Sequence, residues 1–280
     1  MARRSMLFAP GDDPELMRKA ADGEADVIVF DLEDAVAPAD KERARESVRS
    51  VLRDIQFERR LCVRVNPVGA GAATDLDAVL SATHPDSVML PKTGSAEDVA
   101  ALAQLLDGHG ADLPVLSLVE SAAGVLSADE IAAAEPTDAL LFGAEDLAAD
   151  LGATRTSEGT EVLYARQRVV LAASAAGVDA IDTVYTDYGD LDGLREATDR
   201  AVQFGYDGKM AIHPDQVPVI NDAFTPRDEE VEWAKRVVAA ATETDAGVFE
   251  LDGEMIDAPL VTQAERVLER AGDADQDVEQ

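Results

Sequence analysis

Short apolar runs recur along this chain, and most of them end in polar or charged residues. The runs are rich in Val, Ile and Leu without strict alternation, and they lie at residues 6–10, 27–34, 61–66, 87–92, 115–120, 139–146, 178–183 and 208–214. Unbroken apolar runs of this length are typical of parallel strands covered on both faces, whereas half-exposed strands alternate apolar and polar positions. The pattern therefore predicts eight buried strands.

Amphipathic helical patterns separate these runs. ADKERARESVRSVLRDI places Ala44, Val48 and Leu52 on one face, and SAEDVAALAQLLDGHG opens with a capping box at Ser95 and ends in glycine. Eight strand–helix units fit a (β/α)8 TIM barrel, whose usual size is about 250 residues. A doubly wound open sheet is the alternative, but no GxGxxG follows the first run, so the usual dinucleotide fingerprint of that fold is absent.

The chain continues beyond the eighth run. TPRDEEVEWAKRVVAAATET predicts a capped amphipathic helix, and GVFELDGEMIDAP predicts a short strand pair with a turn at Asp252 and Gly253, followed by a last helix. We therefore expect a barrel at 1–224 and a C-terminal helical extension at 225–280.

The charge balance narrows the possible partners. With 24 Lys and Arg against 57 Asp and Glu, the formal net charge is −33, so we expect neither a nucleic acid nor a membrane partner. We expect a cytoplasmic location, because the chain has neither an 18-residue apolar run nor an apolar segment of signal-peptide length. The single cysteine, Cys62, lies in an apolar run and is expected to be a buried thiol. The hydrophobic content of 46% is ordinary for a folded protein, so the acidity does not indicate disorder. We therefore expect a halophilic protein, because 1 M salt screens the repulsion between its acidic side chains beyond about 3 Å.

Charged or polar side chains stand at the predicted strand ends, where barrels of this kind carry their catalytic groups. They are Glu33, Asp34, Arg64, Asn66, Lys92, Glu120, Asp146, Asp182 and His213. Acids and an arginine directed at one mouth suit a hard divalent cation and an anionic ligand rich in oxygen. Glu120 and Asp146 are the best metal candidates, although from spacing alone an ion pair with Arg64 or Lys92 explains them equally well.

The acidic pair Glu33 and Asp34 also has two interpretations. The two carboxylates could orient Arg64 or metal-bound waters in the predicted mouth. They could equally form ion pairs with Lys41 or Arg45, which follow in the next helical pattern, or cap a helix.

Nine segments taken in order resemble the HpcH/HpaI aldolase/citrate lyase family, in the branch of citrate lyase beta-subunit-like proteins and malyl-CoA lyases. They are RSMLFAPGDDP, DVIVFDLEDAVAPADKERAR, VRVN, MLPK, VESAAG, FGAEDLAADLG, AIDTVYTDYGD, GYDGKMAIHPDQ and DGEMIDAP, and they span about residues 3–271. The resemblance implies a Mg²⁺-dependent carbon–carbon lyase that acts on a 3-hydroxyacyl thioester. It also implies a homo-oligomer, a trimer or hexamer, whose subunits exchange active-site lids.

The resemblance assigns roles to particular residues. The glutamate of VESAAG, Glu120, and the aspartate of GAED, Asp146, would hold the metal. Arg64 of VRVN would contact the oxygen on which negative charge develops. Asp257 of MID would be the acid/base on the lid of a neighbouring subunit.

Substrate contacts follow from the same resemblance. By analogy, the backbone amides of Gly143, Ala144, Glu145 and Asp146 would bind the substrate carboxylate. Phe8 and Lys19 lie near the first strand–helix loop, where the family binds CoA. Many relatives carry an arginine in that loop where this chain has Asp13, which weakens the expectation of a phosphate clamp.

The predicted reaction is cleavage of malyl-CoA, methylmalyl-CoA or citramalyl-CoA to a 2-oxoacid, glyoxylate or pyruvate, and acetyl-CoA or propionyl-CoA. The alternatives are a malyl-CoA thioesterase, a citrate lyase beta subunit, and a non-catalytic oxaloacetate- or acetyl-CoA-binding protein. The short segment between Asp146 and Tyr164 resembles the beta-subunit-like branch. The complete set of Arg64, Glu120, Asp146 and Asp257 argues against the non-catalytic alternative.

Overall fold

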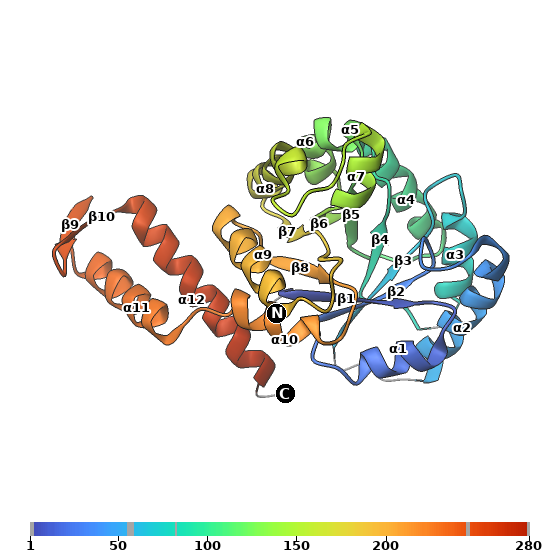
Figure 1. The fold of residues 1–280 in the computed structure, drawn as a ribbon, viewed down its shortest axis with the longest axis horizontal. Coiled ribbons are helices and arrows are strands. Elements are labelled where there is room, and N and C mark those ends of the chain that lie inside the picture. The colour runs from blue at the N-terminus through green and yellow to red at the C-terminus, as the bar shows by residue number, and fades with distance from the viewer. Residues whose placement is uncertain (1–2, 55–58, 82, 245–246, 279–280) are drawn as a thin grey trace. The chain divides into compact units, whose positions relative to one another are not determined.

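The computed structural model describes residues 3–54, 59–81, 83–244 and 247–278. Its main unit is a closed barrel of parallel strands in sequential order, in which the first strand pairs with the last (Figure 1). The barrel strands are β1 (Ser5–Pro10), β2 (Val27–Asp31), β3 (Arg60–Arg64), β4 (Ser87–Leu90), β5 (Val115–Val119), β6 (Thr137–Phe142), β7 (Asp179–Asp182) and β8 (Gly208–Ala211). All eight predicted strands are confirmed, and the TIM barrel with them.

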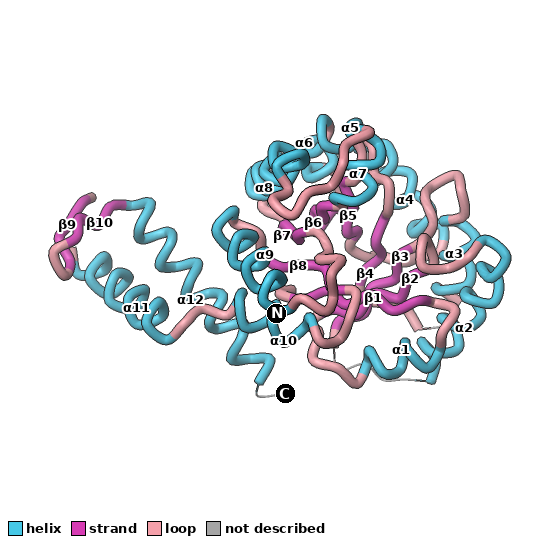
Figure 2. The backbone as a smooth tube through the Cα atoms, viewed as in Figure 1, coloured by secondary structure: helices cyan, strands magenta, loops and turns pink. Residues whose placement is uncertain are grey.

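Helices surround the barrel (Figure 2). They are α1 (Pro14–Ala21), α2 (Lys41–Asp54), α3 (Ala72–Val79), α4 (Ala96–Gly108), α5 (Ala122–Leu126), α6 (Ala128–Ala133), α7 (Ala144–Leu151), α8 (Leu163–Ala176), α9 (Leu191–Phe204) and α10 (Gln216–Phe224). The predicted capping box of α4 is present at Ser95 and Asp98. Helices α3, α5, α7 and α10, each of nine residues or fewer, were not predicted.

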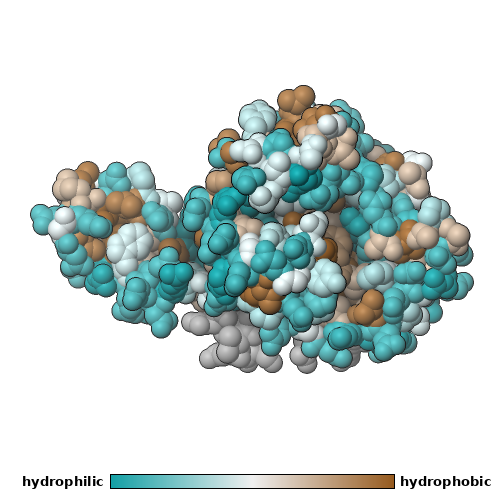
Figure 3. Space-filling model, viewed as in Figure 1, coloured by the Kyte–Doolittle hydropathy of each residue, from teal (hydrophilic) through white to brown (hydrophobic). Residues whose placement is uncertain are grey.

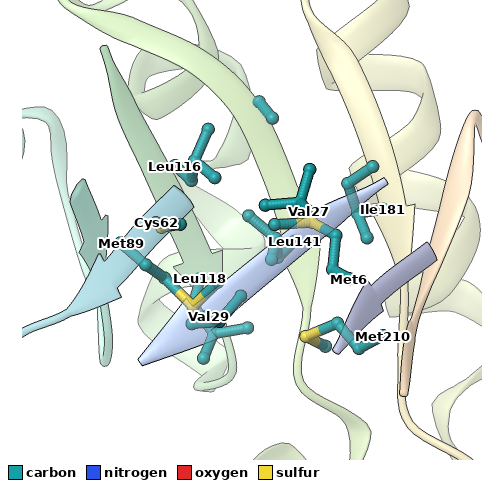
Figure 4. Close-up of a cluster of buried hydrophobic side chains, with 11 residues drawn as sticks. Met6, Val27, Val29, Cys62, Met89, Leu116, Leu118, Leu141, Ile181 and Met210 are labelled. Atoms are coloured by element: carbon teal, nitrogen blue, oxygen red, sulfur yellow. The ribbon is translucent and has the colours of Figure 1, made fainter. Parts of the chain in front are cut away.

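The inside of the barrel is filled by one apolar cluster (Figure 4). Its buried members are Met6, Val27, Val29, Cys62, Met89, Leu116, Leu118, Ala139, Leu141, Ile181 and Met210. Because side chains alternate along a strand, the residue two positions beyond each of these cluster members also faces the barrel interior. Cys62 is fully buried, and burial raises the pKa of its thiol to about 12. It is therefore the inert core thiol that was predicted.

The chain from Asn221 onward forms a second compact unit, with the division falling inside α10. It contains α11 (Asp228–Glu243), the antiparallel pair β9 (Val248–Leu251) and β10 (Glu254–Asp257), and α12 (Ala258–Val278). Ala234, Val237 and Ile256 belong to its buried core. Asp252 and Gly253 form the predicted turn with φ of 55° and 87°, the left-handed conformation that a two-residue hairpin turn requires.

Hydrophilic residues cover most of the visible face of the barrel unit, with hydrophobic side chains standing out near α5 and α6 (Figure 3). A surface of this kind agrees with a net charge of −33. No helix in the described part of the chain is both long and apolar enough to cross a lipid bilayer. The adaptation to high salt stays a prediction.

Candidate active site

A cavity of about 220 Å³ lies at the carboxyl ends of the barrel strands. Its walls include most of the predicted site residues, and the full lining is Phe8, Asp31, Asp34, Ala35, Arg64, Leu118, Glu120, Gly143, Ala144, Glu145, Asp146, Thr183, Val184, Met210 and Ile212. A larger hollow of about 620 Å³ lies at the opposite ends of β5, β6 and β7, and it contains none of the predicted site residues. The cavity at the carboxyl ends is therefore the candidate active site, as expected for this barrel.

Glu120 follows β5 directly and is only 6% exposed. Its Oε1 accepts a hydrogen bond from the backbone N–H of Lys92 at 2.7 Å. Gly143 makes room for it, because a Cβ at that position would lie 2.5 Å from the Cβ and 2.7 Å from Oε2 of Glu120. Burial raises the pKa of Glu120 to about 7, and the negative charge of Asp146 adds to the rise. A buried carboxylate of this kind favours a cation as its partner.

Asp146 is the third residue of α7 and lines the same cavity. Its Oδ2 accepts a hydrogen bond from Nζ of Lys92 at 3.1 Å. Among the described residues, no group of three or more His, Cys, Asp and Glu is arranged to hold a metal ion. Mg²⁺ usually takes only one or two protein carboxylates and completes its octahedron with water and ligand oxygens. The pair Glu120 and Asp146 therefore fits Mg²⁺.

Arg64 is fixed in the mouth by its neighbours. Its Nε and Nη2 donate to the two carboxylate oxygens of Asp31 at 2.7 and 2.5 Å, and its Nη1 lies 3.4 Å from Oε2 of Glu33. The guanidinium carbon stands 4.9 Å from the ring centre of Phe8. Burial alone would lower the pKa of Arg64, but the hydrogen bonds and charge of Asp31 raise it. Arg64 is thus a permanently charged group with a fixed orientation.

The amides at the start of α7 are only partly available to a ligand. The N–H of Gly143 donates to the carbonyl of Val119 at 3.0 Å, and the N–H of Ala144 donates to Oγ1 of Thr183 at 3.2 Å. Both amides already have acceptors within the protein. This corrects the prediction that the amides of Gly143 and Ala144 bind the substrate carboxylate. The amides of Glu145 and Asp146 remain, at the positive end of the α7 dipole.

The ion pairs of Glu33 and Asp34 differ from the predicted ones. Both carboxylates contact Nζ of Lys92, at 2.6 and 3.2 Å. Lys41 instead donates to the backbone carbonyl of Glu33 at 2.6 Å, and Arg45 pairs with Asp75 and Glu42. The prediction of ion pairs with Lys41 or Arg45 was therefore wrong, while the contact of Glu33 with Arg64 agrees with the other interpretation.

Asp182 does not belong to the mouth, although it ends a strand. Ile181 faces the barrel interior, so Asp182 points to the outer side of β7. It is fully buried there, where Arg166 donates to it twice at 2.8 Å and Nζ of Lys209 donates at 2.6 Å. The prediction that Asp182 contributes to the mouth was wrong. Its carboxylate instead forms a buried ion triad with Arg166 and Lys209.

Two other predicted residues, Lys19 and Asp257, are not among the residues that line this cavity. Lys19 is exposed on α1. Asp257 belongs to the second unit, at the end of β10, where it is exposed and accepts a hydrogen bond from the N–H of Leu260 at 3.3 Å. The roles of Lys19 and Asp257 stay predictions.

Sequence reasoning missed two polar residues of the cavity, Asp31 and Thr183. Both lie two positions beyond an interior residue of their strand, Val29 and Ile181. The alternation of side chains along a strand would have predicted both, because Glu120 likewise lies two positions beyond an interior residue, Leu118.

Comparisons with known proteins extend over nearly the whole chain. A family profile described as HpcH/HpaI aldolase/citrate lyase matches residues 4–214. A second profile, described as a C–C bond lyase of the TIM-barrel fold, matches residues 164–272. Both compact units are thus included in the similarity.

Individual relatives agree with these profiles. A citrate lyase subunit beta-like protein from Mycobacterium tuberculosis is 43% identical over 274 residues, covering 96% of this chain and 95% of the relative. The mitochondrial citramalyl-CoA lyase of Mus musculus is 37% identical over 287 residues, covering 95% of this chain and 85% of the relative. The crystal structure of protein CitE from Mycobacterium tuberculosis, in complex with magnesium, acetoacetate and coenzyme A, is 42% identical with a TM-score of 0.84, covering 97% of this chain and 98% of that chain.

Proposed function

The chain belongs to the HpcH/HpaI aldolase/citrate lyase family, and on that premise we propose that it is a Mg²⁺-dependent lyase that breaks a carbon–carbon bond in a 3-hydroxyacyl-CoA. The observation that carries the proposal is the cavity in which Arg64, Glu120 and Asp146 meet at the carboxyl ends of the strands. The magnesium, acetoacetate and coenzyme A held by a relative support the same class of metal and ligands.

Each of these cavity residues would have a separate role in the reaction. Glu120 and Asp146 would hold Mg²⁺, which when bound orients the carboxylate and hydroxyl of the substrate and acts as a Lewis acid. The amides of Glu145 and Asp146 would bind the substrate carboxylate. Arg64 would stabilise the oxygen that gains negative charge, a contribution of about 3 kcal/mol for such donors. Its pairing with Asp31 keeps the guanidinium from having to reorient during the reaction.

The chemical step breaks one carbon–carbon bond and moves two electron pairs. The hydroxyl proton passes to solvent, and the electrons of the O–H bond form the carbonyl of the 2-oxoacid. The bond between the hydroxyl-bearing carbon and the carbon next to the thioester carbonyl breaks, and its electrons pass to the thioester as an enolate. We propose that Asp257 protonates the enolate carbon, a general acid step worth about 10² to 10⁴ in rate.

Asp257 would reach the site as part of a lid formed by 225–280 of a neighbouring subunit in a homo-oligomer. This proposal follows from the family, in which the corresponding aspartate has this role. Phe8, which lines the cavity beside Arg64, and Lys19 on α1 are the proposed contacts for CoA.

The function is tested by assaying the protein in high salt with Mg²⁺ and malyl-, methylmalyl- or citramalyl-CoA. We expect one or more of these thioesters to give glyoxylate or pyruvate without free thiol, and EDTA to stop the reaction. The 2-oxoacid is measured with a dehydrogenase and the free thiol with a disulfide reagent.

Free thiol without 2-oxoacid would identify a thioesterase instead. Turnover that survives EDTA would overturn the metal assignment, and no turnover of any of the three thioesters would overturn the proposed substrate class.

The donated lid is tested by combining two inactive variants, Asp257→Ala and Glu120→Gln. Co-expressed subunits that assemble at random should recover about a quarter of wild-type activity, because a site then works when an intact barrel meets an intact lid from its neighbour. Recovery is measured against each variant purified alone. A lid that closes on its own barrel would give no recovery, and full activity of Asp257→Ala alone would contradict its role as the acid.

A further inference from the structure

Lys92 contacts both residues proposed to hold Mg²⁺. Its backbone N–H donates to Glu120 at 2.7 Å, and its Nζ donates to Oδ2 of Asp146 at 3.1 Å. The same Nζ donates to Oε1 of Glu33 at 2.6 Å and to Oδ2 of Asp34 at 3.2 Å. An ammonium group has three N–H donors, so each of them has a carboxylate partner.

The backbone around Lys92 is held in an unusual conformation. Lys92 has φ of 53°, in the left-handed region that side-chain-bearing residues rarely adopt. The next residue fixes the turn on both sides, because Thr93 donates its N–H to the carbonyl of Leu118 and its hydroxyl to the carbonyl of Leu90. The tertiary structure rather than local preference therefore holds Lys92 here, as is common for residues at functional sites.

The ammonium of Lys92 is ion-paired with the carboxylates of Glu33, Asp34 and Asp146, so it places a positive charge directly beside Asp146. Oxygen ligands lie about 2.0–2.1 Å from Mg²⁺. An ammonium bonded to the same carboxylate would then stand close to a second cation, and the two repel each other.

We propose that Lys92 is a tethered counter-ion that competes with Mg²⁺ for Asp146 and thereby weakens the affinity of the site for the metal. Metal loading separates Nζ from Asp146, while Glu33 and Asp34 retain the ammonium. Lys92 is thus a positioning residue that acts through Asp146. The inference rests on the proposed function only in taking Glu120 and Asp146 as the metal ligands.

The test measures binding of MgCl₂ alone by calorimetry at fixed ionic strength. Lys92→Gln is expected to bind Mg²⁺ about tenfold more tightly or better, in the range by which groups around a metal site alter its affinity. Lys92→Arg keeps the charge and should stay within about threefold of wild type on the same basis. Arg155→Gln is the matched control, because Arg155 pairs with Glu145 on the cavity wall, so its loss removes a charge without removing an ion pair of either proposed ligand.

Thermal unfolding gives a second readout that needs no metal titration. In EDTA, Lys92→Gln should melt below wild type, because Glu33, Asp34 and Asp146 lose their shared cation. Saturating Mg²⁺ should close this gap. An affinity that is unchanged or weaker in Lys92→Gln, the same gap with and without Mg²⁺, or a variant that stays unfolded even with Mg²⁺ would overturn the inference.

The outcome also separates this inference from the proposed function. Wild-type protein that binds no Mg²⁺ would overturn both the metal assignment and the role of Lys92. Wild-type protein that binds Mg²⁺, with a Lys92→Gln variant that binds it no more tightly, would overturn the role of Lys92 alone.

Discussion

Glu120→Gln is expected to lower kcat/KM by about 10³-fold, because a metal Lewis acid supplies several kcal/mol of transition-state stabilisation and each 1.4 kcal/mol changes the rate about tenfold. The glutamine keeps the shape of the side chain and an oxygen that can accept the N–H of Lys92. It loses the charge that a hard cation requires. Steady-state kinetics measure the loss in rate, and calorimetry should show Mg²⁺ binding weakened by about tenfold or more.

The same substitution should not harm the metal-free fold. Burial raises the pKa of Glu120 to about 7, above its ordinary value of about 4.3. The folded state therefore favours the protonated form, and metal-free wild type loses stability as the pH rises from about 4.3 to about 7. A glutamine does not titrate, so in EDTA the melting temperatures should be similar near pH 4 and the variant should melt higher near pH 8.5.

Glu145→Gln is the matched control for these measurements. Glu145 lines the same cavity, but its carboxylate pairs with Arg155, so its loss should leave Mg²⁺ affinity nearly unchanged. Equal losses of affinity in the two variants would contradict a specific metal role for Glu120. A Glu120→Gln protein that is unfolded in EDTA at every pH would contradict the argument from burial.

The barrel could be predicted from the sequence because its physical signal is local and repeated. Each strand is covered on both faces, so each reads as a short apolar run, and the helices between them show their own period. Short helices such as α7, with eight residues, escaped prediction because two turns carry little periodic signal and because α7 begins without a side-chain cap, unlike α1, which Asp13 caps. Their position is decided by the strand that precedes them.

The candidate site could be predicted only in part, because strand ends do not by themselves say which way a side chain faces. Glu120 and Arg64 were found as charges at the ends of apolar runs, and both continue the interior positions of their strands. Asp182 gave the same signal but lies on the opposite face of β7. Asp31 was overlooked inside an apolar run, although it is buried and holds Arg64.

Other features depend on structure that a single sequence pattern does not encode. The use of the Gly143 and Ala144 amides within the protein depends on Val119, at the end of β5, and on Thr183, which follows β7. The proposed role of Asp257 depends on a neighbouring subunit. Contacts of these kinds are set by tertiary and quaternary packing rather than by periodicity along the chain.

Asp182→Ala is expected to lower the free energy of unfolding by about 3–5 kcal/mol, the usual cost of removing one partner from a buried ion pair. Asp182 is fully buried and is the shared acceptor for Arg166 and Lys209, so its loss leaves two cations without this carboxylate. Urea unfolding followed by circular dichroism, in the high salt used for the assay, measures the change. Asp129→Ala is the control, because it removes the exposed pair with Arg168 and should cost about 1 kcal/mol or less.

The pH dependence of Asp182→Ala provides a second check on the same triad. Burial lowers the pKa of Lys209 even in the wild type, and removal of Asp182 takes away the charge that opposes this shift. In the variant, folding therefore favours the neutral amine, and the deficit in stability should shrink as the pH rises toward about 10.4, the ordinary pKa of lysine. A stability deficit that stays constant up to that pH would contradict a buried Lys209 that depends on Asp182. A deficit no larger than that of Asp129→Ala would mean that the triad does not stabilise the packing of β7 and β8 against α8.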